Sequence, residues 1–222
     1  MPNSIQEVKL NAAQVKQMFL YVGEQVRENK PFLTKIDSAI GDGDHGIGMT
    51  VGFTKAEENL TKKEFMTIND VFKTIGMSMI ANMGGASGVI FGTLFTGGVK
   101  GMDPQEELTL PILAQILDGS LKAIKERGKA ELGDKTMIDA LEPAALGIKQ
   151  SIQANHSLLE GLINAEKCAA DGVEKSKEYV AKFGRAKSLG ERAIGHQDAG
   201  ATTVWIMFKS MREWVEKAAA QQ

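Results

Sequence analysis

Residues 37–46, with the sequence DSAIGDGDHG, hold three carboxylates and a histidine among three glycines. Asp37, Asp42 and Asp44 would be unfavourable together on their own, because like charges a few ångströms apart raise one another's pKa. A cation should therefore lie among them. Oxygen ligands without a nearby cysteine favour a hard ion, and Mg²⁺ combines one or two carboxylates with water and substrate phosphates. The segment predicts a metal and phosphate site.

Two familiar motifs overlap this segment, and neither fits. Gly41, Gly43 and Gly46 match the GxGxxG spacing of dinucleotide-binding loops, but the carboxylates between them would repel a pyrophosphate, and no strand-like run precedes them. A calcium loop beginning just after Gly41 would need Gly and Glu where the chain has Ile47 and Phe53. The remaining alternative is a solvated acidic turn.

Composition excludes several classes of protein. The chain has 222 residues, of which 43% are hydrophobic, and we expect a single domain over residues 1–222. Its net charge is −2 and its basic residues are scattered, which argues against nucleic-acid binding. The first residues lack the pattern of a signal peptide, and no apolar run approaches the ~18 residues of a membrane span. These features predict a cytoplasmic protein with no membrane contact.

Apolar residues recur at spacings of three and four, as in the stripe Val15, Met18, Phe19, Val22 and Val26, and strand-like alternation is nearly absent. This pattern predicts an all-α protein with eight helices. They are expected near residues 11–29, 48–59, 67–82, 87–100, 109–127, 136–153, 157–182 and 200–219.

The glycine-rich polar segments 40–46, 83–88, 127–137 and 184–203 all lie between these helices. If consecutive helices run antiparallel, loops separated by an even number of helices emerge at the same end of the bundle. All four segments should then meet at one rim. Stability alone gives no reason for that arrangement, so the convergence favours a functional site over a plain helical interaction protein.

Each segment offers groups suited to a nucleotide. Gly84 and Gly85 let the backbone approach an anion, and Ser87 lies where a helix begins. Residues 128–136 resemble a Walker A motif with one residue too many, and they follow a helix instead of a strand, so a P-loop is not expected. Positive charge at the same rim is expected from Lys129, Lys135, Arg185 and Arg192.

The motifs IGDGDHG, GGASG, RGKAELGDKTM and GRAKSLGERAIGHQDAGAT, in this order and spacing, resemble the nucleotide-binding L subunit of dihydroxyacetone kinases, called DhaL. The resemblance covers essentially the whole chain. It implies an eight-helix antiparallel up-and-down barrel whose rim binds ADP or ATP through two Mg²⁺ ions.

The same resemblance implies roles for individual residues. The metal ligands would be Asp37, Asp42 and Asp44. Met137 would lie against the base and Arg185 nearer the phosphates. The full set of expected nucleotide-binding residues is His45, Gly46, Ala86, Ser87, Gly128, Met137, Arg185, Asp198 and Gly200. No residue is expected to act as a covalent nucleophile, and His45, His156 and His196 need not be phosphorylated.

In such kinases a separate K subunit holds the small ketone, and no segment here resembles that subunit. Some members retain ADP, which a multiphosphoryl partner called DhaM rephosphorylates, whereas others exchange ATP. The closeness of residues 184–203 to the first group favours a protein donor, while Gly48 and Ala199 depart from that group's pattern. The resemblance also leaves a homodimer open. Two alternatives remain: an ATP-dependent kinase subunit for another short ketose such as erythrulose, and a non-catalytic Mg–nucleotide module that regulates a partner.

Overall fold

Nine α-helices and one 3₁₀ helix make up most of residues 9–220, the part of the chain that this computed structural model describes. The elements are β1 (Leu10–Asn11), α1 (Ala12–Glu28), α2 (Lys30–Ile40), α3 (His45–Leu60), α4 (Ile68–Asn82), α5 (Gly85–Gly98), β2 (Glu107–Leu108), α6 (Leu110–Gly128), α7 (Ile138–Gln153), α8 (Leu158–Ser176), η1 (Arg185–Ala193) and α9 (Ala199–Ala219). The predicted all-α class is confirmed.

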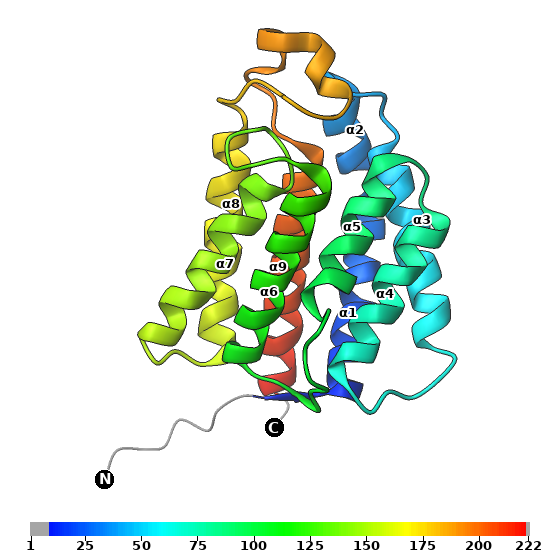
Figure 1. The fold of residues 1–222 in the computed structure, drawn as a ribbon, viewed down its shortest axis with the longest axis vertical. Helices are drawn as coiled ribbons and strands as arrows, with labels where there is room; N and C mark the ends of the chain where they lie inside the picture. Colours follow the sequence, from blue (N-terminus) through cyan, green and yellow to red (C-terminus); the bar gives the residue numbers. More distant parts are fainter. Residues whose placement is uncertain (1–8, 221–222) are drawn as a thin grey trace.

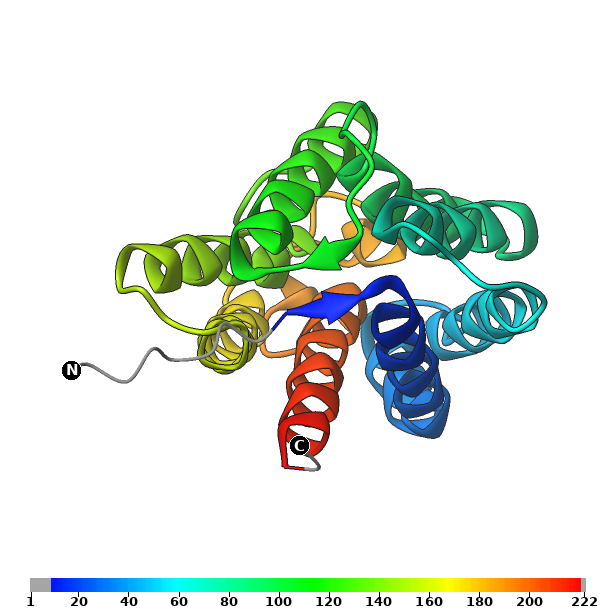
Figure 2. The same ribbon diagram turned by 90° about the horizontal axis from the view of Figure 1, so that it is seen from below.

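The long helices form a closed ring. From α3 to α9 each helix packs against the next, α1 packs against α3, and α9 closes the ring against α1. Figure 2 shows this ring end-on, with the antiparallel pair β1 and β2 (Leu10 opposite Leu108) lying across its lower end. Neighbouring helices run in opposite directions (Figure 1), so the predicted antiparallel barrel is confirmed.

Local sequence signals explain where several helices begin. Asn11 and Gln14 form a capping box at the start of α1, and Ser157 and Glu160 form another at the start of α8. Each pair satisfies backbone N–H groups that have no partner within the helix. Thr109 caps α6 by accepting from the N–H of Ile112. These caps all lie at the lower end of the barrel.

Each of the eight predicted helices has a counterpart, but α2 was not predicted. It continues α1 beyond a break at Asn29 (Figure 1). Pro31 explains the break, because it has no N–H to donate to the carbonyl group of Arg27, four residues earlier. The same residue suits the first turn of a new helix. As a result Asp37, expected in a loop, lies in the last turn of α2.

The helix predicted over 157–182 ends earlier, at Ser176, and η1 follows within the segment that was expected to be a loop. Beyond the end of α8, Ala181 packs with Ile40 and Ala193 in a small second core. Ala186 and Leu189 of η1 pack against this core. The second core therefore fixes η1 against the end of α2.

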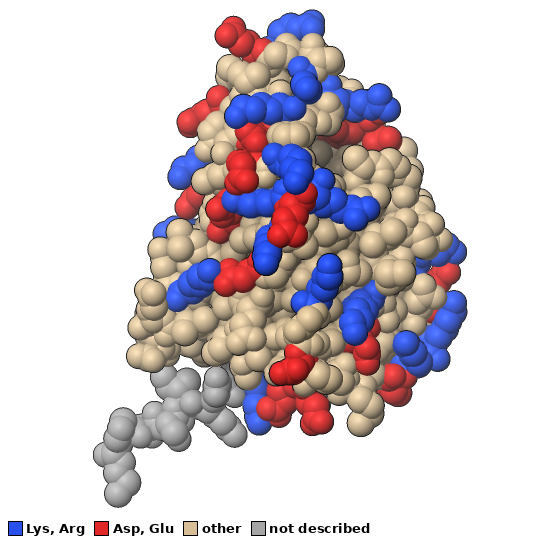
Figure 3. Space-filling model, viewed as in Figure 1, with Lys and Arg blue, Asp and Glu red and all other residues tan. Residues whose placement is uncertain are grey.

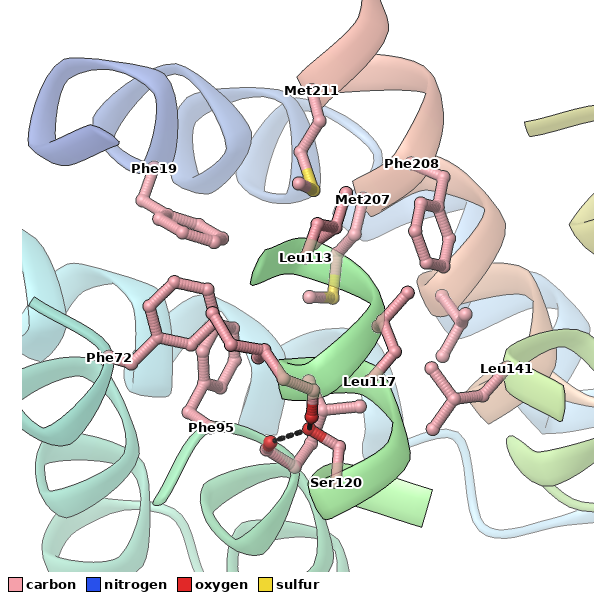
Figure 4. A pocket seen from close by; sticks show the side chains of 13 residues that line it. Phe19, Phe72, Phe95, Leu113, Leu117, Ser120, Leu141, Met207, Phe208 and Met211 are labelled. Carbon is pink, nitrogen blue, oxygen red and sulfur yellow. Dashed lines mark hydrogen bonds between the residues drawn. The ribbon is translucent and has the colours of Figure 1, made fainter. Parts of the chain in front are cut away.

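Aromatic and methionine side chains fill the interior of the barrel. Phe19 packs edge-on against Phe72 and Phe95, with ring centroids 5.0 and 5.5 Å apart. Figure 4 shows these rings together with Met207 and Met211 of α9, all directed into the centre. The remaining cavity of about 30 Å³ is lined almost entirely by apolar atoms. The barrel is thus a packed core and not a channel, and any polar site must lie on its surface.

The four glycine-rich segments meet at one end of the barrel, as predicted: the connections α2–α3, α4–α5, α6–α7 and α8–α9 all lie at the top in Figure 1. The helices α3, α5, α7 and α9 consequently begin at this rim. Among residues 9–220, no helix has the length and apolarity needed to cross a membrane.

Close packing of α8 on α7 supports the rim, and a substitution there should be costly. A Cβ atom at Gly172 would collide with the carbonyl oxygen of Asp139 and lie 2.9 Å from Cα of Ala140. We expect Gly172→Ala to lower the free energy of unfolding by about 1–3 kcal/mol or more, measured by urea denaturation.

The control is Gly48→Ala in α3, where the added Cβ would meet only Cε of Met83, at 3.7 Å. Alanine favours the helix, so this variant should be neutral or more stable by up to ~1 kcal/mol. Equal changes in the free energy of unfolding for the two substitutions would show that the close contact of Gly172 with α7 does not cause the loss of stability.

Candidate metal and nucleotide site

Three carboxylates converge where α2 meets α3. Asp37 lies in the last turn of α2, Asp42 in the connection and Asp44 directly before α3. One oxygen of each lies within 4.8 Å of the others. Gly43 between them has φ +75°, a backbone conformation that favours glycine and allows the tight turn. The structure therefore brings together the three residues that the sequence singled out as metal ligands.

Local energetics at this cluster favour a bound cation. Asp37 lies at the C-terminal end of α2, where the helix dipole disfavours a carboxylate. Asp44 precedes α3, yet its side chain makes no capping hydrogen bond. Burial raises the pKa of Asp44, and the charges of Asp42 and Asp37 raise it further. Hard oxygen ligands in this number suit Mg²⁺, so the donor set fits that ion.

Arg185 of η1 reaches the cluster and forms an ion pair with Asp42, with Nε 2.9 Å from Oδ2. The side chain of Arg185 is 79% exposed, so the pair itself contributes little stability. Its position matters more, because it places a planar cation beside the acidic cluster. Figure 3 shows further Lys and Arg side chains around this end of the molecule, with acidic residues among them.

His45 is buried directly below the carboxylates. Its backbone N–H donates to Asp37 at 3.2 Å, and its Nε2 lies 2.8 Å from the hydroxyl oxygen of Thr203 in α9. Burial lowers the pKa of His45 to about 4, against the opposing effect of Asp37. The neutral ring therefore connects α3 to α9. Thr203 was not singled out from the sequence, because one threonine on a helix gives no local signal.

The start of α5 leaves backbone N–H groups available. Gly84 precedes the helix without any side-chain cap, and Gly85 has φ +70°. Ala86 is exposed and Ser87 is half-buried. A Cβ atom added at Gly84 or Gly85 would meet nothing within 4 Å, so the space beside this turn is open. A helix N-terminus with free amides suits an anion.

Two buried or partly buried carboxylates shape the α6–α7 connection. Asp139 accepts from the N–H groups of Gly133 and Thr136, at 2.6 and 2.7 Å. Asp134 accepts from the N–H of Glu131 and pairs with Lys182. Met137, expected to lie against the base, is 4% exposed and directly precedes α7. This connection is therefore held by its own hydrogen bonds.

At the start of α9, Asp198 accepts from the N–H of Ala201 at 2.7 Å. Burial raises the pKa of Asp198 to about 7, and the negative charges of Asp139 and Asp37 add to the shift while Lys135 opposes it. Gly200 allows close approach to the α6–α7 connection, because a Cβ there would lie 3.3 Å from Cβ of Met137. The start of α9 thus faces both the acidic cluster and α7.

Gly46 and Gly128, which were also expected to bind the nucleotide, allow close packing of neighbouring elements. A Cβ atom at Gly46 would lie 2.6 Å from the carbonyl oxygen of Lys30 and 3.0 Å from the backbone nitrogen of Thr34, so glycine lets α3 approach α2. A Cβ at Gly128, the last residue of α6, would lie 3.2 Å from Cδ1 of Ile90. Both residues position the rim through their backbone.

Lys135 differs from the expectation that it supplies positive charge at the rim. Only 2% of this residue is exposed, and its ammonium group donates to the carbonyl oxygens of Ser176 and His196. Lys129 and Arg192 remain exposed. The sequence resembles a phosphate-binding motif here, but the extra Asp134 and the preceding helix place the lysine within the fold.

The model of the DAK2 domain family matches residues 39–213. The PEP-dependent dihydroxyacetone kinase 1, ADP-binding subunit DhaL, of Listeria innocua is 40% identical over 85% of this chain and 89% of its own length. The DhaL subunit of Escherichia coli is 36% identical over 92% of this chain and 97% of its own length.

A solved structure shares the fold. The dihydroxyacetone kinase from C. freundii, in complex with AMP-PNP and Mg²⁺, matches 96% of this chain and 36% of that chain, with a TM-score of 0.70 and 24% identity. The chain belongs to the DAK2 domain family, and the two relatives named above, which it covers over most of their length, are DhaL subunits. Membership places it among kinase subunits, which are transferases.

The raised pKa of Asp198 predicts how stability depends on pH. A folded-state pKa of about 7 against an ordinary value of 3.8 means that the fold favours the protonated form. The contribution of this carboxyl group to the free energy of unfolding is fully present below pH ~4 and is lost as pH rises to ~7. We therefore expect Asp198→Asn, which can still cap α9, to stabilise the nucleotide-free protein at pH 8 by up to ~4 kcal/mol.

Urea denaturation at pH 5 and pH 8 measures this gain, which should be larger at the higher pH. Asp171→Asn, on the exposed side of α8, is the matched control and should show no such difference. A gain that is the same at both pH values would contradict the assignment of the shift to Asp198.

Proposed function

We propose that this chain is the nucleotide-binding subunit of a dihydroxyacetone kinase, which supplies a phosphoryl group from a bound Mg–nucleotide to dihydroxyacetone held by a separate K subunit. The observation that carries the proposal is the set of three carboxylates within 4.8 Å at a rim where four helices begin. The names of the DhaL relatives, which describe ADP-binding subunits of PEP-dependent dihydroxyacetone kinases, support it.

Asp37, Asp42 and Asp44 would hold two Mg²⁺ ions, which when bound neutralise the charge of the phosphates and of the transferred group. Residues from every connection at the rim would surround the nucleotide. They are His45, Gly46, Ala86, Ser87, Gly128, Met137, Arg185, Asp198 and Gly200. The chain as a whole would serve as one nucleotide-binding domain.

The contribution of the protein to the transfer would be positioning and charge neutralisation. Phosphoryl transfer passes through a loose transition state that needs little covalent chemistry from the protein. The N–H groups at the start of α5, which have no side-chain cap, and the guanidinium group of Arg185, which pairs with Asp42, would contact the phosphates. His45 is buried and neutral, which suits a supporting role and not that of a covalent nucleophile.

The rim would also be the surface for the partner. Transfer requires the attacking hydroxyl group to approach nearly in line with the leaving oxygen, so the K subunit must dock where the nucleotide lies. A DhaM-type phosphocarrier that recharges bound ADP would need access to the same rim.

The names of several relatives, which call their kinases PEP-dependent or PTS-dependent, favour such a donor. Two erythrulose kinases, 32% and 30% identical over this region, keep another short ketose as the alternative substrate.

Nucleotide binding should require the metal. Three clustered carboxylates repel a polyphosphate until bound cations invert the local charge. We expect calorimetry to detect ADP binding in Mg²⁺ buffer and none in EDTA. Asp42→Ala or Asp44→Ala should weaken Mg–ADP binding or transfer on the order of a hundredfold, as expected for loss of a charge-stabilising group.

Asp171→Asn again serves as the control, because it removes a carboxylate outside the cluster. Undiminished ADP affinity in EDTA would refute the metal-dependent site. An effect of Asp171→Asn equal to that of Asp42→Ala would show that general charge, and not the cluster, governs binding.

The donor can be tested by nucleotide retention. A subunit that keeps ADP as a resident cofactor should retain close to one ADP per chain after purification in Mg²⁺ buffer without added nucleotide, since slow release accompanies tight binding. Chromatography of the denatured protein measures the ADP. A nearly empty protein that turns over added ATP with a K subunit would instead identify an ATP-dependent kinase subunit. An empty protein inactive with every K subunit would favour a regulatory module.

A further inference from the structure

The connection between α8 and α9 is a long segment whose two ends lie side by side. It comprises residues 177–198, includes η1 and carries Arg185 to the acidic cluster. The N–H of Gly195 donates to the carbonyl oxygen of Lys177 at 2.7 Å, and the N–H of Asp198 donates to the hydroxyl oxygen of Ser176 at 3.0 Å. We call this junction of 176–177 with 195–198 the neck of the segment.

One buried ammonium group joins both sides of the neck. Lys135, from the α6–α7 connection, donates to the carbonyl oxygen of Ser176 on one side and to that of His196 on the other. Ser176 is fully buried and Lys135 is 2% exposed, so water has little access to the hydrogen bond between them. Burial lowers the pKa of the Lys135 ammonium group, and the negative charges of Asp198 and Asp139 oppose that shift and favour the charged form.

The backbone at Lys135 is unusual. Its φ of +59° lies in the left-handed region, which side chains other than glycine and asparagine rarely adopt. A strained backbone persists where surrounding contacts determine it. Here the N–H groups of Gly133 and Thr136, on either side, both donate to Asp139. The α6–α7 connection is thus folded so that the lysine points inward to the neck.

We propose that Lys135 is a positioning residue, whose buried ammonium group closes the neck of segment 177–198 and thereby holds Arg185 against the acidic cluster. The effect of Lys135 on nucleotide affinity rests on the proposed function. The closing of the neck by Lys135 does not. The second core supports the same segment just beyond the neck, where Ala181 and Ala193 pack on Ile40. The neck and this core together fix η1 above the end of α2.

A competing interpretation is that Lys135 binds phosphate directly, as a lysine in a Walker A motif does. The two differ in what they predict for Arg185. If Lys135 acts through Arg185, loss of both residues should be little worse than loss of one. If both contact phosphate independently, their effects should multiply.

The experiment compares four forms of the full chain: wild type, Lys135→Met, Arg185→Ala and the double variant. Calorimetry gives the Kd for Mg–ADP. We expect each single substitution to weaken binding about tenfold, and the double variant to remain within about threefold of Arg185→Ala, because the effects are not additive when one residue acts through the other. A hundredfold loss in the double variant, or wild-type affinity in Lys135→Met, would overturn the inference.

A second measurement does not depend on nucleotide. Protease Glu-C cleaves after Glu178 and Glu191, which none of these substitutions alters. Opening of the neck should speed cleavage within the segment about tenfold in Lys135→Met, because cleavage follows the population of the open form. Lys177→Met is the matched control: this lysine also lies at the neck, but within residues 9–220 its ammonium group pairs only with exposed Glu174, so cleavage should be unchanged. Equal cleavage of Lys135→Met and wild type would refute neck closure.

These outcomes separate the two proposals. If the wild-type chain fails to bind Mg–ADP, the proposed function fails, while the cleavage rates still test the neck. If Lys135→Met does not fold, Ser176→Ala replaces it, because this variant removes the oxygen that accepts from the N–H of Asp198. Ser176→Ala should then speed cleavage and weaken Mg–ADP binding in the same non-additive way with Arg185→Ala, and its failure to do so would overturn the inference.

Discussion

The mutual repulsion of three carboxylates is the constraint on which the rim depends. Asp37, Asp42 and Asp44 come within 4.8 Å of one another because α2 and α3 meet at a sharp corner. Gly46 lets α3 approach the backbone of α2 at this corner, and the backbone N–H of His45 donates a hydrogen bond to Asp37. The fold therefore concentrates negative charge at a point where nothing but a cation can offset it fully, with Arg185 supplying only an exposed partner.

The fold remains stable despite this concentrated negative charge because the barrel keeps the carboxylates away from the apolar core. The interior is filled by Phe19, Phe72, Phe95 and the methionines of α9, and it contributes the apolar burial that stabilises the fold. Antiparallel helices then place alternate connections at the same end. Because stability resides in the ring and the glycine-rich connections lie on its rim, the rim can carry groups that the fold does not favour. Asp44 and Asp198, both with raised pKa values, lie there.

Features that are local in sequence were predictable. The stripe from Val15 to Val26 is fully buried apart from a small exposure of Phe19, and the acidic cluster was found because its three residues lie within eight positions of one another. Features that depend on distant contacts were not. The helix α2 has Pro31 in its first turn, a residue that suits both the end of one helix and the start of another, and η1 depends on a second core assembled from Ile40, Ala181 and Ala193. The inward turn of Lys135 depends on carbonyl groups more than forty positions away in the case of Ser176 and sixty in the case of His196.

Charge links these distant parts of the rim. The charges of Asp139 and Asp198 both act on Lys135, and the charge of Asp37 at the acidic cluster contributes to the raised pKa of Asp198. A cation bound among Asp37, Asp42 and Asp44 would lower the local negative potential and so favour ionisation of Asp198. The start of α9 and the neck of segment 177–198 share Asp198, whose backbone N–H donates to Ser176 and whose carboxylate caps the helix. Metal binding at the acidic cluster would therefore act, through charge, on Asp198 and so on the groups that hold segment 177–198 in place.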